Sequence, residues 1–257
     1  MNVAGTEVSV VDVFVGPDAL GNPAGVVIDD DGLDEVSMAS IARKVGLSET
    51  AFVSQGAEHA SLRWFTPSCE VDLCGHATLA AMAVLSTATG DPSASFSSQA
   101  GLLTASTVGD RSVVLLPSRA SSPVAVPAWA ERAGSRGAMR SDGVLLVELE
   151  GPGALKAFAP ELAVLKKDPA EMTIVWAMGG VGAEVSVRVF GPRIGIDEDP
   201  VTGSAHCSLG PVVAERLGEP SYRVHQCSAR GGRLEVTVVD EGVSIAGVTK
   251  VRAEEGT

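Results

Sequence analysis

Short apolar-rich runs recur along the chain, and at 60–65 and 185–190 polar and apolar residues alternate, which predicts an architecture built mainly from short strands. Each run has the length of a strand, and turn-forming residues separate it from the next. The clearest runs occupy residues 8–14, 60–65, 112–116, 143–149, 172–178, 185–190 and 234–239.

Two segments depart from the strand period. Apolar residues of segment 38–45 recur at helical spacing, and Gly46 is placed to end that helix. The run 77–85, which follows Gly75, is apolar on every face and too short to span a bilayer, which takes about 20 residues. Such a helix must be buried on all sides. We therefore expect a central helix wrapped by strands.

A short motif occurs twice. The string R-x-F-x-P stands at residues 63–67 and again at 188–192, 125 residues later. Each copy ends a strand-like run and is followed by an acidic segment, a glycine-containing turn and a helix-like run. Because the offset is close to half the chain, the pattern indicates a duplication. We predict that the two halves have the same topology, with one central helix in each.

The segment between the halves has the composition of a linker. Residues 117–127 are rich in Pro, Ser and Ala. The sequence thus predicts an N-terminal domain over 1–117 and a C-terminal domain over 118–245.

Charge and cysteine content exclude several classes of protein. The chain has 19 basic and 32 acidic residues and a net charge of −13, and a polyanion or an anionic membrane would be repelled. The four cysteines form no C-x-x-C pair, so neither a metal site nor a disulfide scaffold is expected. The N-terminus has no signal-peptide pattern. We expect a cytoplasmic protein with reduced thiols that binds no nucleic acid and no membrane.

Each glycine turn that precedes a helix-like run is a candidate anion site. The N–H groups at a helix start carry partial positive charge and bind carboxylates, and Gly75 and Gly203 place no Cβ in the way. If both helix starts faced one inter-domain cleft, they could hold a substrate carboxylate. Alternatively, both glycines serve only to make strand-to-helix turns.

Titratable residues cluster around these turns. Glu49 enters an apolar strand, where a raised pKa would suit a proton shuttle, although it could equally be a solvated strand-end carboxylate. His76 could contact a ligand or bond to backbone at the edge of the core. Asp199 could orient a base or cap the turn before the second helix. His206, inside the second helix-like run, fits a structural role better.

Cys74 invites a thiol mechanism because a cysteine at a helix start has a lowered pKa. The other half carries DPVT over 199–202 where a second cysteine would stand, and Cys207 lies too deep in its helix to replace it. A two-thiol racemase therefore lacks one partner. We predict that Cys74 is a small apolar filler and is dispensable for chemistry.

Taken together, the motifs resemble the phenazine-biosynthesis PhzF-like family. They occur in the family's order across nearly the whole chain. They are VDVF at 11–14, GNPAGVV at 21–27, LSETAF at 47–52, RWFTP at 63–67, CGHATL at 74–79, EDPVTGSAH at 198–206 and SARGG at 228–232.

The resemblance implies the diaminopimelate-epimerase-like fold, an α+β architecture of two similar domains, each a strand-rich barrel around a central helix, with the site in the cleft between them. It also implies that the tail, residues 246–257, returns to the first domain. By motif, the family's proton-shuttling glutamate falls on Glu49, and its site histidine and aspartate fall on His76 and Asp199. Substrate-binding positions fall on Asn22, Gly75, Gly203 and Ser204.

The leading interpretation is an isomerase that needs neither metal nor organic cofactor. Glu49 would move a proton on a small carboxylate-bearing metabolite, and the protein would be a homodimer. Two alternatives stay open, namely an amino-acid racemase or epimerase of the same fold and a metabolite-binding protein without turnover. Solvent-hydrogen exchange distinguishes an isomerase from a binder.

Overall fold

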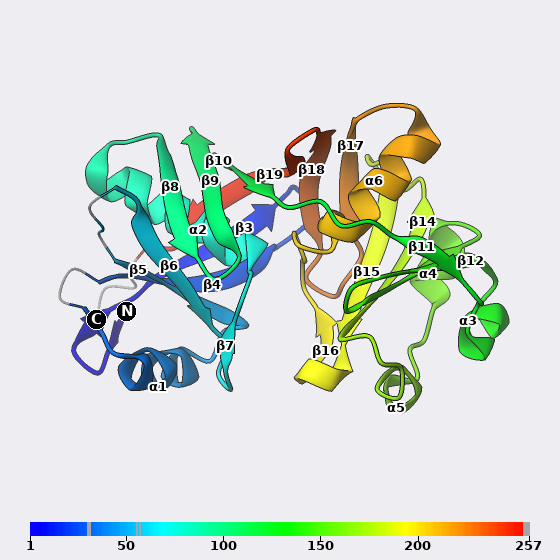
Figure 1. Ribbon diagram of the computed structural model, residues 1–257, viewed down its shortest axis with the longest axis horizontal. Coiled ribbons are helices and arrows are strands. Elements are labelled where there is room, and N and C mark those ends of the chain that lie inside the picture. Colours follow the sequence, from blue (N-terminus) through cyan, green and yellow to red (C-terminus); the bar gives the residue numbers. More distant parts are fainter. Residues whose placement is uncertain (30–31, 55, 57, 254–257) are drawn as a thin grey trace. The chain divides into compact units, whose positions relative to one another are not determined.

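The computed structural model describes residues 1–29, 32–54, 56 and 58–253. The chain divides into two compact units (Figure 1). The first comprises residues 1–116 and the segment from Ile245 onward, and the second comprises residues 117–244. Within the described residues, no helix combines the length and the apolar character needed to cross a bilayer.

Helices and strands of the first unit follow the order expected from the sequence, with short additions at the N-terminus. They are β1 (Asn2–Val3), β2 (Thr6–Glu7), β3 (Ser9–Val15), β4 (Asn22–Asp29), α1 (Glu35–Val45), β5 (Glu49–Ser54), β6 (Ala60–Phe65), β7 (Glu70–Val71), α2 (Gly75–Thr89), β8 (Ser93–Ser98), β9 (Gly101–Val108), β10 (Arg111–Leu116) and β19 (Gly242–Val251).

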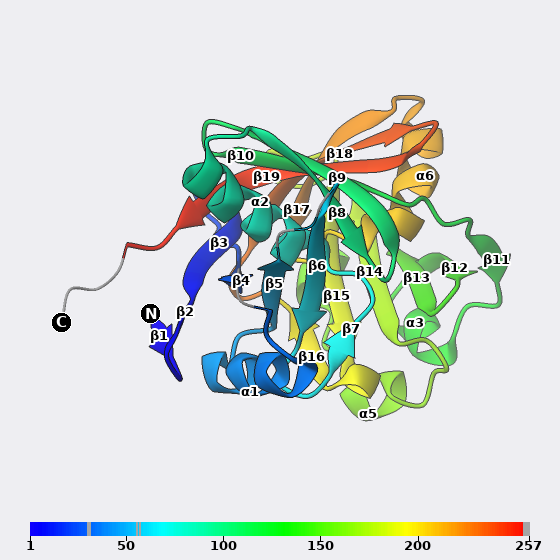
Figure 2. The same ribbon diagram turned by 60° about the vertical axis from the view of Figure 1, so that its left-hand side comes forward.

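The strands of the first unit form a barrel around α2 (Figure 2). β3 pairs antiparallel with β4, β4 parallel with β5, and β5 antiparallel with β6. β6 then pairs parallel with β8, which pairs antiparallel with β9, and β9 pairs antiparallel with β10. β19 pairs with both β3 and β10 and thereby closes the ring.

The central helix α2 is buried because its side chains are small and apolar on every face. All residues from Gly75 to Ala83 are buried, and Leu79 and Met82 are among the largest fully enclosed side chains. Strands β3, β4, β5, β8, β9 and β10 all contact it. The predicted all-round burial is confirmed for the first part of the helix, whereas its last residues, from Thr87 to Thr89, are exposed.

The helix predicted over 38–45 is also confirmed, as α1. The Asp34 side chain accepts a hydrogen bond of 2.8 Å from the Ser37 N–H at its start, and Gly46 ends it at φ 68°, a left-handed conformation that suits glycine. Met38 and Ile41 face inward and pack against apolar residues that include Phe52. The helix thereby covers the strand that begins with Glu49.

The second unit repeats the first. Its elements are β11 (Ser122–Val124), α3 (Ala128–Arg132), β12 (Ser135–Ser141), β13 (Val144–Leu149), α4 (Pro152–Ala157), α5 (Leu162–Leu165), β14 (Met172–Met178), β15 (Val185–Gly191), a 3-10 helix (Pro192–Ile194), β16 (Ile196–Asp199), α6 (His206–Leu217), β17 (Ser221–Gln226) and β18 (Gly232–Val239).

Strand pairing in the second unit follows the same sequence of directions as in the first. β12 pairs antiparallel with β13, β13 parallel with β14, β14 antiparallel with β15, β15 parallel with β17, and β17 antiparallel with β18. α6 takes the place of α2 and contacts this sheet through side chains such as Ser208, which bonds to Ser141, and Arg216, which lies over the Trp176 ring. The predicted repeat of topology is therefore confirmed.

The predicted linker is not entirely loop. Residues 122–124 form β11, which pairs antiparallel with β12. Pro123 has no N–H to donate, and β11 tolerates it because it is a short strand paired with β12 on one side of this unit's sheet. Composition alone indicated a linker because Pro and Ser are common in both loops and short edge strands.

The repeated R-x-F motif has a structural explanation in both units. Arg63 on β6 donates two hydrogen bonds of 2.6 Å to Glu70 on β7, and its guanidinium carbon lies 5.1 Å from the centre of the Phe65 ring. Arg188 on β15 donates bonds of 2.7 and 2.8 Å to Glu198 on β16, again with its guanidinium carbon 5.1 Å from a ring, that of Phe190. The motif thus ties each long strand to the short acidic strand that leads to the central helix.

Candidate functional site

Glu49 is the first residue of β5, the barrel strand that follows α1 in the chain. Its backbone pairs with Ala24 on β4. Its side chain is 12% exposed. Oε2 is buried and makes an ion pair with His76, but it has no hydrogen-bond partner among the described residues. A carboxylate oxygen in this position can exchange a proton with a neighbouring group.

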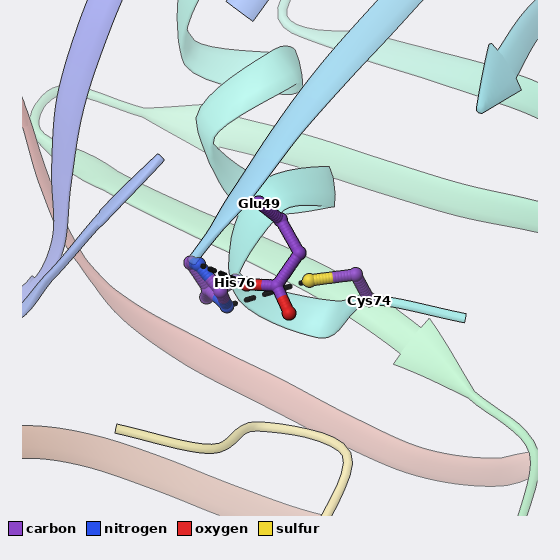
Figure 3. A group of neighbouring side chains, drawn as sticks. All are labelled: Glu49, Cys74 and His76. Atoms are coloured by element: carbon purple, nitrogen blue, oxygen red, sulfur yellow. Dashed lines mark hydrogen bonds and ion pairs between the residues drawn. The ribbon is translucent and has the colours of Figure 1, made fainter. Parts of the chain in front are cut away.

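His76, the second residue of α2, holds that carboxylate in place (Figure 3). Nε2 lies 3.4 Å from Glu49 Oε2 and 3.4 Å from the hydroxyl of Ser48. The Ser48 hydroxyl donates a hydrogen bond of 3.2 Å to Oδ1 of Asn22, a fully buried residue at the start of β4. Glu49, His76 and Asn22, which were predicted separately, therefore belong to one cluster. Ser48, which connects them, was not predicted.

Burial raises the pKa of Glu49 from 4.5 to about 6, and a hydrogen bond with Ser48 opposes the rise. The physical cause is the loss of solvation of the charged form. A carboxyl group with this pKa is present in both protonation states near neutral pH. It meets the requirement for a general acid and base.

The raised pKa should also lower the stability of the native protein. Below pH 4.5 the carboxyl is protonated in both states, whereas above about pH 6 the native state carries a buried charge that the unfolded state exposes to water. At 1.36 kcal/mol per pKa unit the penalty is about 2 kcal/mol. The free energy of unfolding of Glu49→Gln minus that of the wild type should therefore increase by about 2 kcal/mol as the pH rises from 4 to 7. Urea unfolding of both proteins measures this difference.

Glu70→Gln is the matched control because Arg63 lowers the pKa of Glu70. The Glu70 carboxylate stabilises the native protein at pH values above the pKa that this group has in the unfolded chain. The stabilisation is lost as the pH falls and the carboxylate is protonated. This variant should therefore lose stability relative to the wild type as the pH rises. Equal pH dependence of the two variants would contradict the assignment of a buried, destabilised carboxyl to Glu49.

Cys74 makes a polar contact that an apolar filler would not make. Its Sγ lies 3.4 Å from Nδ1 of His76, and it is also within 4.8 Å of a ligand atom of Glu49 (Figure 3). The sulfur caps no N–H of α2, although Cys74 is the residue before the helix. The buried thiol is therefore part of the cluster, and its dispensability for chemistry stays a prediction.

Ligand atoms of Glu49, Cys74 and His76 all lie within 4.8 Å of one another, as a metal site would require. The sulfur, however, faces Nδ1 and the carboxylate faces Nε2. A cation would use only one of these nitrogens, so the three side chains offer it three ligand atoms. A structural zinc site has four such ligands, and the group found among the described residues has three.

Asp199, at the end of β16, lies in the second unit. It accepts a hydrogen bond from the hydroxyl of Thr202, and its backbone carbonyl accepts one of 2.9 Å from Gln226 Nε2. The Gln226 carbonyl in turn accepts a bond of 2.9 Å from the Thr202 N–H. Gln226, which no motif indicated, therefore fixes the turn that carries Asp199.

The two predicted helix starts differ. α2 begins at Gly75, as predicted. α6 begins at His206, two residues after Ser204, because the preceding turn is tighter, with His206 N–H bonded to Gly203 O and Cys207 N–H to Ser204 O. The prediction that Gly203 and Ser204 start a helix is therefore wrong in detail. They form the tight turn that leads into it.

His206 is fully buried at the start of α6 and packs against the ring of Tyr222 at a centroid distance of 6.4 Å. Burial lowers its pKa to about 3, so the ring is neutral. Its surroundings are those of a packed core.

Comparison with known proteins identifies similar chains over most of the length of this one. The model of a family described as "Phenazine biosynthesis-like protein" matches residues 11–141 and 134–254. An uncharacterized isomerase from Pseudomonas aeruginosa is 44% identical over 242 residues, with 92% of each chain covered. Both matches span the Glu49 cluster and the turn that carries Asp199.

Solved structures of similar proteins have the same fold as this chain. A phenazine biosynthesis PhzC/PhzF protein from Clostridium difficile superposes with a TM-score of 0.87 at 32% identity and covers 98% of this chain and 99% of its own. A hydroxyproline epimerase from Agrobacterium vitis shares the fold, with a TM-score of 0.61 at 12% identity and coverage of 96% and 91%. The predicted diaminopimelate-epimerase-like architecture is confirmed.

Proposed function

Because the chain belongs to the phenazine biosynthesis-like (PhzF) family, we propose that it is a cofactor-independent isomerase that shifts a proton on a small carboxylate-bearing metabolite. The observation that carries the proposal is the Glu49 carboxyl, buried against His76 with a pKa raised to about 6. Relatives named isomerases support the reaction class.

In the proposed reaction the Glu49 carboxylate removes a proton from carbon. The electron pair of the broken C–H bond moves into the unsaturated system of the substrate, and the Glu49 carboxyl then returns the proton at another position, which regenerates the carboxylate. We assign His76, whose Nε2 lies 3.4 Å from Oε2 of Glu49, to stabilise the shifting charge or to relay the proton. The overall change is an isomerisation, so no oxidant or second substrate is needed.

Binding of the substrate carboxylate is assigned to backbone N–H groups. Gly75 starts α2 without a side-chain cap from Cys74, and the helix dipole adds positive potential there. We assign Asn22 a supporting role through Ser48, and we assign Gly203 and Ser204 to the second unit's contribution to binding. Asp199, whose turn is held by Thr202 and Gln226, is assigned to stabilise the shifting charge or to relay a proton.

Two other functions compete with this one. A two-thiol racemase would need a second cysteine in the second unit, but Thr202 stands before Gly203 where Cys74 stands before Gly75. A buried carboxyl with a raised pKa lowers the stability of the protein at neutral pH. A protein that only binds a metabolite does not need such a group, whereas an acid–base catalyst does.

The test is a panel of small unsaturated and 2-amino carboxylates, each incubated with the protein in heavy water and followed by NMR. An isomerase incorporates deuterium at carbon and moves a double bond, and Glu49→Gln abolishes both effects. Labelling with inversion at a stereocentre would indicate a racemase. A compound that raises the melting temperature but gains no deuterium would indicate a binding protein.

A further inference from the structure

Three side chains of the first unit carry three different kinds of metal ligand to one place. The sulfur of Cys74, the ring of His76 and the carboxylate of Glu49 offer atoms that all lie within 4.8 Å of one another (Figure 3). Thiolate, imidazole and carboxylate are the ligand types that Zn²⁺ takes in proteins. Among the residues that the structure describes, these three form the one such group.

The spacing of the cysteine and the histidine suits a single tetrahedral cation. Sγ of Cys74 lies 3.4 Å from Nδ1 of His76. With a Zn–S bond of about 2.3 Å and a Zn–N bond of about 2.0 Å, this separation corresponds to a ligand angle of about 100°, close to the tetrahedral value. The third ligand is an oxygen of Glu49. No C-x-x-C pattern indicates the site, because its ligands come from β5 and from the start of α2.

The groups around His76 direct the correct nitrogen toward the sulfur. The Ser48 hydroxyl donates a hydrogen bond of 3.2 Å to Oδ1 of Asn22 and lies 3.4 Å from Nε2 of His76. Because the hydroxyl uses its own proton in the bond to Asn22, it accepts the Nε2–H of the ring. The lone pair of Nδ1 then faces Cys74. A histidine that binds a metal usually donates its other ring N–H to a neighbour in this way.

The charges of the ligands also match a divalent cation. Cys74 is 6% exposed, the Glu49 side chain is 12% exposed, and Oε2 of Glu49 has no hydrogen-bond partner among the described residues. A buried carboxylate in this state is costly. A thiolate and a carboxylate carry two negative charges, which one divalent cation neutralises. Because Mg²⁺ and Ca²⁺ prefer oxygen ligands, the sulfur and the nitrogen favour Zn²⁺.

We propose that Glu49, Cys74 and His76 bind one Zn²⁺ ion, and that the bound ion inhibits the enzyme reversibly. Zinc binding follows from the geometry of the cluster, whereas the inhibition rests on the proposed function. On binding, the Cys74 thiol releases its proton to solvent, and an oxygen of Glu49 donates a lone pair to the metal. The carboxylate then cannot act as a base toward substrate carbon. Removal of the ion by a chelator restores it.

The first experiment measures metal binding without a substrate. Co²⁺, which accepts the same ligands, is titrated into the reduced protein, prepared without a histidine tag, and the absorbance is recorded. A sulfur-to-cobalt charge-transfer band in the near ultraviolet should reach saturation at one ion per chain. Zn²⁺ should then displace Co²⁺ and remove the band, because a tetrahedral ligand set that includes sulfur favours Zn²⁺. Mg²⁺ at the same concentration should leave the band unchanged.

Two variants test the assignment of the ligands. Cys74→Ser should remove the charge-transfer band. Cys74→Ser and Glu49→Gln should each weaken Zn²⁺ binding at least about tenfold in competition with a chromophoric chelator, since even the loss of a group that only supports a ligand typically costs about 10- to 100-fold. Cys227→Ser is the matched control and should alter neither the band nor the affinity. Its sulfur also lies beside an imidazole, 3.6 Å from Nδ1 of His225, but the pair belongs to no such group of three among the described residues.

Inhibition is measured on any panel compound that the wild type labels with deuterium. Saturating Zn²⁺ should lower the labelling rate at least about a hundredfold, because it occupies the base, and EDTA should restore the rate. A wild type that binds Zn²⁺ and keeps its full rate would overturn the inhibition.

The binding measurements decide the site by themselves. A wild type without the charge-transfer band, or an affinity for Zn²⁺ that neither Cys74→Ser nor Glu49→Gln alters, would overturn it. Should Cys74→Ser fail to fold, Glu49→Gln still decides the assignment. If Zn²⁺ binds as expected but no panel compound is labelled, the zinc site is supported and the proposed reaction is at fault.

Discussion

Glu49→Gln should retain substrate binding and lose turnover by at least about a hundredfold, within the range of about 10² to 10⁴ typical of a general acid–base group. Glutamine keeps the shape of the side chain and one carbonyl oxygen, but it cannot take up a proton. The N–H groups at the start of α2 remain in place to hold a carboxylate. The measurements are kcat and KM on a panel compound that the wild type labels, together with the rate of deuterium incorporation.

The dependence of kcat/KM on pH is an independent test of the role of Glu49. The carboxylate form acts as the base, so kcat/KM of the wild type should rise with pH through a value near 6. Glu70→Gln, which alters a carboxylate paired with Arg63, should leave that limb unchanged. A Glu49→Gln protein that binds and turns over at a rate near that of the wild type would show that Glu49 is a strand-end carboxylate and would refute the mechanism.

Much of the fold could be predicted from the sequence because local signals and tertiary packing agree. The all-apolar run after Gly75 has no stable place except the interior of a barrel, and the structure puts it there as α2. The R-x-F string is repeated because each copy makes the same pair of contacts, to an acidic residue and to an aromatic ring. Burial of a whole helix and a repeated set of side-chain contacts both restrict which residue types can stand at each position, so both can be recognised in the sequence.

Within the site, the sequence predicted residue types but not their contacts. Glu49 and His76 lie 27 positions apart, and their meeting depends on the parallel pairing of β4 with β5 and on the position of α2 inside the barrel. Gln226 and the thiol contact of Cys74 left no signal, since one is an ordinary polar residue at a strand end and the other depends on a ring orientation. The exact start of α6 was missed because a tight turn and a first helical turn look alike in sequence.

Arg188→Met should be the most destabilising change at the repeated motif. The Arg188 side chain is 13% exposed, donates two hydrogen bonds to Glu198 and a third, of 2.6 Å, to the carbonyl of Phe158. Methionine fills part of the volume but leaves the carboxylate and the carbonyl without their donor. Breaking a pair of this kind typically costs about 3 to 5 kcal/mol.

Arg63→Met in the first unit is the matched control, because the motif and the ring contact are the same while the surroundings differ. Arg63 is 29% exposed, and its second acidic partner, Glu35, lies at the surface. Water can therefore solvate what the substitution uncovers, and the expected loss is about 1 kcal/mol. The free energy of unfolding is measured for both variants by urea denaturation with probes in each unit, since the units need not unfold together. A loss for Arg63→Met equal to or larger than that for Arg188→Met would mean that burial of the ion pair does not determine its contribution, and that the Phe158 carbonyl bond adds nothing to the stability of the second unit.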